Sequence, residues 1–234
     1  MRTEEQILKI KSRISDPYKV DNFITKEDID QLLKIWNDHE GDKVYKPTSP
    51  VTLDLYPYLE DDVLKKILLK IEKEIGPFAI DSAFFYDVDY PHIIHMDDTF
   101  KYSDVYKAIT LPLLIDGPKL DVSPKMCFFD QFYFHGPAKF FRDEEHMPTY
   151  YNTQIYDYKN VDGKIGGKFS VEHRLKYMTH LKPRWLDGLS LHSVLDWVPT
   201  SAIIFDSTRI HCGGDFRSLG IKRKMGISIF TKVL

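Results

Sequence analysis

Residues 105–115, VYKAITLPLLI, decide the fold class. This stretch is dominated by β-branched and other apolar residues and has an aspartate on either side. That composition is typical of a short buried strand. Five further segments have the same character, at 79–88, 93–97, 125–134, 202–206 and 222–233. Because these strands follow one another without long helices in between, they predict an antiparallel sandwich or barrel.

Ahead of Pro77 the hydrophobic spacing is helical. Thr25, with Asp28 three residues later, forms a capping-box start for a helix that places Ile29, Leu32 and Trp36 on one face. A second amphipathic pattern runs over 60–75 and stops at the Gly76-Pro77 pair. We therefore expect residues 1–76 to be supporting helices and residues 77–234 to be the β-rich core of a single domain.

Composition excludes several classes of protein. The 234 residues (27.5 kDa) are 43% hydrophobic, 29% charged and 14% aromatic, which are globular proportions. The formal net charge of −3 does not mark the chain as a nucleic-acid binder, so no nucleic-acid partner is expected. Two cysteines and no apolar leader-like run after Met1 predict a cytosolic protein free of disulfides, and no apolar run is long enough to predict a membrane span.

The strand-like pattern is interrupted between about 140 and 195. This stretch is rich in Tyr, Lys and His, and it is too long for an ordinary connection. Within it, residues 159–184 hold seven basic and two acidic side chains. We interpret it as an insertion, either a solvated loop or a lid that receives an anionic substrate.

One histidine is followed two residues later by a carboxylate, in the sequence His95-Met96-Asp97. Alternate residues of a strand point to the same face, so His95 and Asp97 can grip one ion from adjacent positions. They supply two thirds of the facial triad that holds non-heme Fe(II) with open coordination positions. Since one His-x-Asp is expected by chance in this chain, the motif needs support from its context.

A third ligand is available after the strand at 202–206. His211 follows that strand, and the next strand opens with the basic residues 222–224. A cation that enters an apolar strand is costly unless it meets an anion. A dicarboxylate co-substrate would supply such an anion.

With these features the sequence resembles the Fe(II)- and 2-oxoglutarate-dependent oxygenases, and among them the phytanoyl-CoA dioxygenase and prolyl hydroxylase branches. The resemblance covers roughly residues 77–234. It rests on His95-Met96-Asp97, on the strand that leads to His211, and on a basic residue about a dozen positions further on. It implies a mainly β fold with supporting helices, a double-stranded β-helix (a cupin-like jelly roll).

The resemblance also implies the site. Fe(II) would be held by His95, Asp97 and His211, and the far carboxylate of 2-oxoglutarate would bind Arg223, with Lys222 as the second choice. These two basic residues point to opposite faces of a regular strand, so only one of them is expected to bind.

Further positions stay open. Arg217 and Lys224 are weaker candidates for the basic residue, because its spacing from the distal histidine varies in the family. His92 is expected on the face opposite His95. The second co-substrate contact is open among four residues: Lys107, Thr110, Tyr86 and Tyr102.

The activity implied is that of an oxidoreductase. A dioxygenase of this kind is a hydroxylase that consumes O₂ and 2-oxoglutarate and releases succinate and CO₂. Its substrate would be a small molecule or a peptide, with an anionic one included. Two alternatives remain: a cupin-type metalloenzyme that does not use 2-oxoglutarate, and a non-catalytic jelly-roll binding module.

Overall fold

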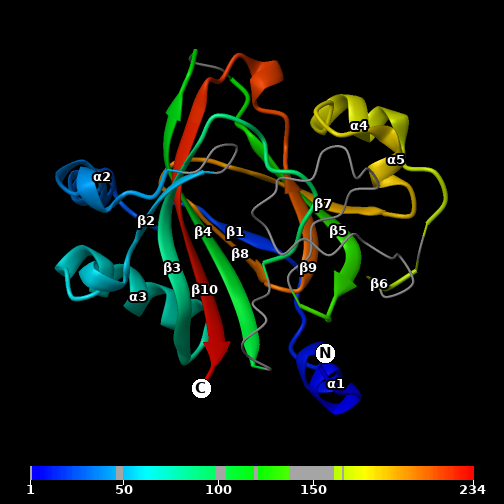
Figure 1. Cartoon of the computed structure of the whole chain (residues 1–234), viewed down its shortest axis with the longest axis horizontal. Coiled ribbons are helices and arrows are strands. Elements are labelled where there is room, and N and C mark those ends of the chain that lie inside the picture. The colour runs from blue at the N-terminus through cyan, green and yellow to red at the C-terminus, as the bar shows by residue number, and fades with distance from the viewer. Residues whose placement is uncertain (1, 46–49, 98–103, 119–120, 137–160, 165) are drawn as a thin grey trace.

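The computed structural model describes residues 2–45, 50–97, 104–118, 121–136, 161–164 and 166–234. Two antiparallel sheets face each other (Figure 1). The larger sheet has the strand order β1-β8-β4-β10-β3-β2; the smaller has the order β6-β5-β7, with β9 also paired to β5. The strands are β1 (Tyr18–Val20), β2 (Val51–Asp54), β3 (Phe78–Val88), β4 (Val105–Asp116), β5 (Lys125–Tyr133), β6 (Val161–Asp162), β7 (Leu191–Asp196), β8 (Ala202–Asp206), β9 (Arg209–Gly213) and β10 (Arg223–Val233).

Helices cover the outer face of the larger sheet (Figure 1). The Thr25 capping box starts α2 as predicted, and Gly76 ends α3 with a positive φ of 81°. The α-helices are α1 (Glu4–Lys11), α2 (Lys26–Asp38), α3 (Asp62–Ile75), α4 (Val171–Tyr177) and α5 (Pro183–Leu186), and the 3₁₀ helices are η1 (Glu40–Asp42), η2 (Tyr56–Tyr58) and η5 (Arg217–Leu219). Apolar side chains of α2 and α3 form one core with the sheet.

The mainly β architecture predicted from the sequence is confirmed, with five of the six predicted strands present. Segment 93–97 is the exception, since it makes only an isolated bridge between His95 and His211. Five strands were not predicted from the sequence: β1, β2, β6, β7 and β9. Strand β6 and nearly all of β7 lie in the 140–195 stretch that was expected to be an insertion, yet both pair with β5 in the smaller sheet.

Strand β10 places its two faces in different surroundings. Met225, Ile227 and Ile229 belong to the core shared with the helices. Lys224, Ser228 and other residues of the opposite parity face the smaller sheet and line a cavity between the sheets. The apolar face of this strand therefore points away from the cavity.

None of the helices in the described ranges combines the length and apolar character needed to cross a membrane.

Candidate metal centre and its cavity

Residues 91–97 carry two of the predicted ligands without forming a strand. Reciprocal backbone hydrogen bonds of 2.9 Å join His95 to His211, and the Asp97 amide donates to the Ser207 carbonyl at 2.9 Å. Ile94 and Met96 are buried in a separate apolar cluster behind this segment. The side chains of His95 and Asp97 consequently share one side, as the sequence analysis predicted, although the cause is a local bridge and not a strand.

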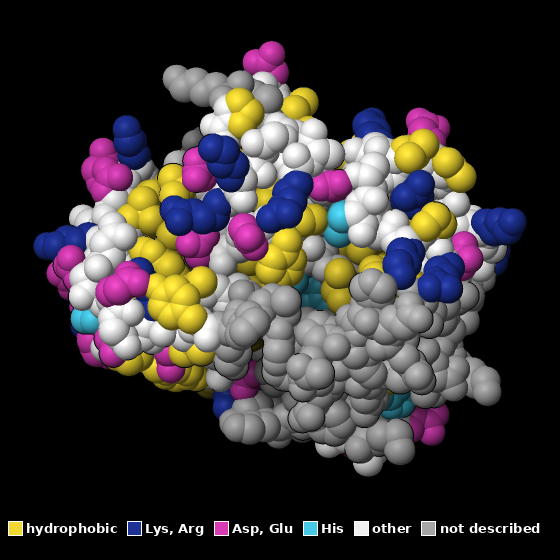
Figure 2. Space-filling view, turned by 45° about the horizontal axis from the view of Figure 1, so that its top comes forward, with side chains coloured by type: hydrophobic (Ala, Val, Ile, Leu, Met, Phe, Trp, Pro, Cys, Tyr) yellow, Lys and Arg dark blue, Asp and Glu magenta, His cyan; other side chains and the backbone are white. Residues whose placement is uncertain are grey.

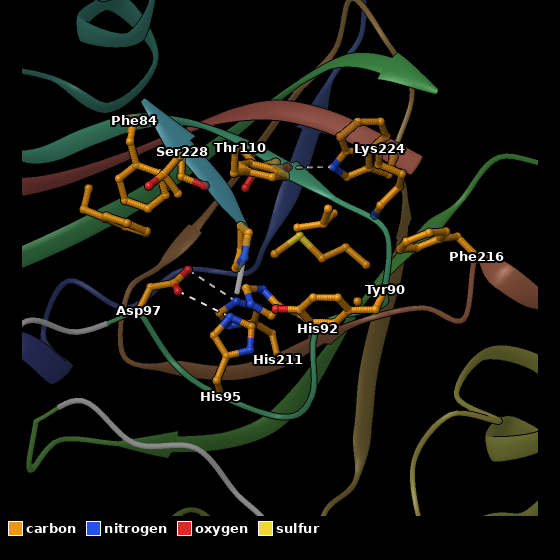
Figure 3. A pocket seen from close by; sticks show the side chains of 18 of the residues that line it. Phe84, Tyr90, His92, His95, Asp97, Thr110, His211, Phe216, Lys224 and Ser228 are labelled. Atoms are coloured by element: carbon orange, nitrogen blue, oxygen red, sulfur yellow. Dashed lines mark hydrogen bonds and ion pairs between the residues drawn. The ribbon is translucent and has the colours of Figure 1, made fainter. Parts of the chain in front are cut away.

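The structure brings His95, Asp97 and His211 together. Their potential ligand atoms all lie within 4.8 Å of one another. The two carboxylate oxygens of Asp97 lie 3.4 Å from His95 Nε2 and 3.3 Å from His211 Nε2 (Figure 3). His211 was expected after the strand at 202–206. It lies within a further strand, β9, and is 1% exposed.

Hydrogen bonds fix the tautomer of both histidines. His95 Nδ1 lies 2.7 Å from the Ile93 carbonyl, and His211 Nδ1 lies 2.9 Å from the Arg209 carbonyl. Because a carbonyl oxygen only accepts, each Nδ1 must carry the hydrogen, which leaves each Nε2 with a lone pair directed at Asp97. Metal-binding histidines are held in this way by a second hydrogen bond. The three residues thus fit a divalent transition metal in donor type, number and tautomer.

The electrostatics favour the ligand forms of these side chains. Burial lowers the pKa of His95, and the neighbouring His211 lowers it further, which favours the neutral imidazole. Burial alone would raise the pKa of Asp97, but its interactions with the imidazoles of His211 and His95 outweigh burial and lower that pKa. Asp97 is therefore a carboxylate at neutral pH.

The cluster opens into a cavity of about 430 Å³ between the two sheets. Figure 2 shows its mouth as a hollow with histidine at the bottom and Lys and Arg side chains on the surrounding surface. The described lining comprises Pro50, Thr52, Ser82, Phe84, Tyr86, Val88, Tyr90, His92, His95, Asp97, Thr110, Lys125, Met126, Trp197, His211, Gly213, Phe216, Lys224, Ser228 and Phe230.

Lys224 is the buried cation of this cavity. The residue is 6% exposed, and its ammonium lies 4.5 Å from the Trp197 ring centroid and 4.9 Å from that of Phe216. In the described part of the chain, its ammonium has no hydrogen bond or ion pair with another residue. Burial lowers the pKa of Lys224 to about 7. A buried ammonium that lies near two ring faces and has no described carboxylate partner is suited to bind an anionic ligand.

The structure does not place Arg223 or Lys222 in the cavity, so these sequence-based choices do not fit its geometry. Arg223 is on the outer face of β10, where its Nε lies 3.4 Å from Asp87, and Lys222 is exposed. Arg223 has the same strand parity as Met225, Ile227 and Ile229, and this apolar face packs against helices α2 and α3. The opposite face lines the cavity, so the buried cation there is Lys224.

Five other candidates remain: one for the basic residue and four for the second co-substrate contact. The structure distinguishes those that line the cavity from those that do not. Arg217 is exposed and lies against Asp89. Lys107 is outside the cavity lining, because its ammonium binds Asp206. Tyr102 lies outside the described residues. The cavity thus retains Tyr86 and Thr110.

Tyr86 extends across β10 beneath Lys224. A Cβ at Gly226 would lie 2.7 Å from the Tyr86 hydroxyl, so glycine is needed for this crossing. The hydroxyl accepts a 3.3 Å hydrogen bond from Trp197 Nε1, and no acceptor for its own hydrogen is found among the described residues. Because burial raises its pKa, Tyr86 keeps its proton and can donate it to a ligand.

The prediction that His92 lies on the face opposite His95 is wrong. It lines the cavity, and its ring centroid is 4.8 Å from that of His95. The strand parity argument failed here because 93–97 is not a strand. The one signal that could have pointed to Lys224 is the small and polar composition of Gly226 and Ser228 on its own face of β10.

Sequence comparison with curated proteins and with family models finds no match. Structural comparison finds matches over nearly the whole chain. The epimerase SnoN, solved with Fe³⁺, α-ketoglutarate and nogalamycin RO, aligns with a TM-score of 0.53 at 11% identity over 98% of this chain and 83% of its own.

Two further structures have similar TM-scores. The non-heme α-ketoglutarate-dependent carbocyclase SnoK from nogalamycin biosynthesis aligns with a TM-score of 0.52 at 7% identity over 99% of this chain and 84% of its own. HygX from Streptomyces hygroscopicus, solved with nickel and 2-oxoglutarate bound, aligns with a TM-score of 0.51 at 8% identity over 100% of this chain and 88% of its own. The fold is the double-stranded β-helix. At these identities the likeness establishes the fold, and the chemistry must be argued from the site.

Proposed function

We propose that this protein is an Fe(II)- and 2-oxoglutarate-dependent oxygenase that hydroxylates its substrate. One observation carries the proposal: the His-Asp-His cluster lines the same cavity as a buried lysine, Lys224, that has no ion pair with a described residue. A metal site alone would fit many enzymes of this fold. The additional cation favours a co-substrate with a carboxylate at the end remote from the metal, as 2-oxoglutarate has, over a cupin-type enzyme without one.

In this proposal His95 Nε2, His211 Nε2 and an Asp97 oxygen hold Fe(II). The carbonyls of Ile93 and Arg209 keep both imidazoles in the required tautomer. When bound, the iron would supply the redox chemistry in which one oxygen atom of O₂ converts 2-oxoglutarate to succinate and CO₂ and the other hydroxylates the substrate. The protein's own tasks are to fix the ligand geometry and to exclude bulk water.

The far carboxylate of 2-oxoglutarate would receive an ion pair from Lys224 and a hydrogen bond from the Tyr86 hydroxyl. These two donors come from adjacent strands, because Lys224 pairs with Val88 and Gly226 with Tyr86 in the β10–β3 register. Thr110 also lines the cavity, but it pairs with Ser228, four residues along β10 from Lys224, so Tyr86 is the better placed second contact.

The test is anaerobic Fe(II) binding, followed by 2-oxoglutarate binding and succinate formation in air. The parent should bind about one Fe(II) per chain and then 2-oxoglutarate. Asp97→Ala and His211→Ala should each weaken iron binding by more than about 100-fold, since even outer partners of metal ligands are worth 10–100-fold. Both variants should stay folded by circular dichroism.

His92→Ala is the matched control. It alters a cavity histidine beside His95 that is not in the ligand cluster, so iron binding should equal that of the parent. Iron binding at full strength in both triad variants would overturn the metal site. Iron binding without any 2-oxoglutarate binding would favour the cupin-type alternative, and no metal binding at all would favour a binding module.

A further inference from the structure

The cavity has two chemically different ends along β10. Lys224 and Ser228 both line it and are four residues apart, which corresponds to about 13 Å along a strand. Figure 3 shows Lys224 on one side of the ligand cluster and Ser228 with Phe84 on the other. Under the proposed function, 2-oxoglutarate fills the space between Lys224 and the metal, so the Ser228 end is left for the substrate.

Unused hydroxyl groups mark this second end. Ser228 pairs in register with Phe84 on β3 and with Thr110 on β4, so these side chains form one row across the inner face of the sheet. Ser82 and Thr52 extend the hydroxyl lining toward β2. None of these four hydroxyls hydrogen-bonds to another residue that the structure describes. Hydroxyls that face a cavity without partners are suited to a ligand's oxygen atoms.

The apolar part of this end is aromatic. Phe84 and Phe230 lie with ring centroids 5.7 Å apart and planes tilted by 56°, forming one wall. Aromatic faces favour flat or cyclic ligand groups.

Charge is sparse at the same end. Asp97, which the metal would neutralise, is its only charged side chain among the described lining residues. Lys125 belongs to the opposite end, where its carbonyl binds the Gly214 amide and its ammonium pairs with Asp196. Among the described residues, a carboxylate or phosphate on the substrate would find no cation beside Ser228 and Phe84, and a charged group without a counter-ion is costly to bury.

We infer that the Ser228 end takes a neutral ring compound that carries hydroxyl, ether or carbonyl oxygens along one edge. The ring lies against Phe84 and Phe230, and its oxygens meet the hydroxyls of the Ser228 row. This inference rests on the proposed function and replaces the expectation of an anionic substrate at this site. Phe84 and Ser228 would be specificity-determining residues.

The experiment uses the full chain loaded with 2-oxoglutarate and with Zn(II), which does not react with O₂. Binding of two neutral probes, 2,7-dihydroxynaphthalene and methyl glucopyranoside, is measured by ligand-observed NMR and compared with 2,6-naphthalenedicarboxylate and glucuronate. At least one neutral probe should bind about tenfold tighter than its charged counterpart. Comparing the aromatic probe with the saturated one shows whether the site prefers a planar aromatic ring or a saturated, sugar-like ring.

Variants locate the bound probe. Phe84→Leu keeps most of the side-chain volume but removes the aromatic face, so it should weaken binding of the neutral probe roughly tenfold. Ser228→Val should weaken binding of the same probe about two- to tenfold. Phe78→Ala, on the same strand but outside the cavity lining, should bind like the parent.

Equal or tighter binding of the charged probes, no neutral binding at millimolar concentration, or no effect of both Phe84→Leu and Ser228→Val would overturn the inference. Loading with 2-oxoglutarate is measured first in the same samples. If 2-oxoglutarate fails to bind, the proposed function fails; if it binds and the neutral probes do not, only the substrate inference fails.

Discussion

Two buried lysines on adjacent strands of the larger sheet have opposite surroundings. Lys107 on β4 is 5% exposed, and its ammonium lies 2.5 Å from Asp206 and 2.7 Å from the Ser15 hydroxyl. Asp206 also accepts a 2.9 Å hydrogen bond from the Ser15 amide. Lys224 on β10 is buried to the same degree, yet its ammonium has no ion pair with a described residue and lies near the rings of Trp197 and Phe216.

The difference separates structure from function. The Lys107–Asp206 pair satisfies its own charges and ties the segment before β1 to the end of β8, so it needs no ligand. Lys224 carries a desolvated charge that no described carboxylate neutralises, and its lowered pKa reflects that cost. Buried charges that the fold leaves uncompensated concentrate at functional sites. An external anion is therefore the natural partner of Lys224.

The largest expected contrast is in folding stability. Lys107→Met leaves Asp206 buried without its counter-ion and should lower the free energy of unfolding by about 3–5 kcal/mol. Lys224→Met removes an uncompensated charge of similar burial and should leave stability unchanged or higher below pH 7, where the lysine is protonated in the folded protein. Urea denaturation at pH 6.5 compares the two variants. Equal destabilisation by Lys107→Met and Lys224→Met would contradict the proposed difference between the two lysines.

The next effect concerns 2-oxoglutarate. A charge-assisted contact in a desolvated pocket is worth about 1.5–3 kcal/mol, so Lys224→Met should weaken 2-oxoglutarate binding about 10- to 100-fold. Iron affinity should stay at the parent level. Arg223→Met is the matched control, because Arg223 is the neighbouring cation on the outer face of the same strand. Calorimetric titration of the metal-loaded protein measures both. A loss with Arg223→Met instead would restore the parity that the sequence first suggested.

The two faces of β10 also show how far the sequence could predict the site. Strand composition was sufficient for the fold class and for β10 itself. The two-residue periodicity of a strand shows only that Arg223 and Lys224 face opposite ways. Which face meets the cavity depends on helices α2 and α3 covering Met225, Ile227 and Ile229, a tertiary arrangement that strand periodicity does not encode.

The ligand cluster was predictable for a different reason. His95 and Asp97 share a side because Ile94 and Met96 are buried behind them, and this alternation is visible in the sequence. The same alternation misplaced His92, since the chain from Pro91 to Asp97 is irregular except at one bridge. Strands β1 and β6 were not predicted because three and two residues are too few for a periodic signal.

A third prediction uses pH to sharpen the comparison of the two lysines. The pKa of Lys224 is lowered to about 7, so the free site is cationic below pH 7 and becomes neutral above it. Binding of the 2-oxoglutarate dianion favours the protonated lysine. Its affinity should therefore fall by up to about tenfold per pH unit from pH 7 to pH 9.

The Lys224→Met variant supplies the control for that titration. Its weaker affinity should be nearly flat over the same range. His180 and Cys127 are the described titratable groups that interact with Lys224, and they can be replaced by Gln and Ala to remove their contributions. A parent affinity that is constant from pH 7 to pH 9 would contradict the assignment of Lys224 as the cation.

The smallest effect tests whether Lys224 acts alone. Tyr86→Phe removes the hydroxyl that accepts from Trp197 and faces Lys224's end of the cavity, but it keeps the ring that crosses Gly226. If Tyr86 donates to the same carboxylate as Lys224, its loss should weaken 2-oxoglutarate binding by about three- to tenfold, because the ion pair remains. In the Lys224→Met background the further loss should differ from that factor, since two donors to one carboxylate are coupled. Calorimetry on the four proteins of this cycle measures the coupling. Strict additivity would place the two side chains on different parts of the ligand, and an unchanged affinity in Tyr86→Phe would show that Lys224 binds the carboxylate without Tyr86.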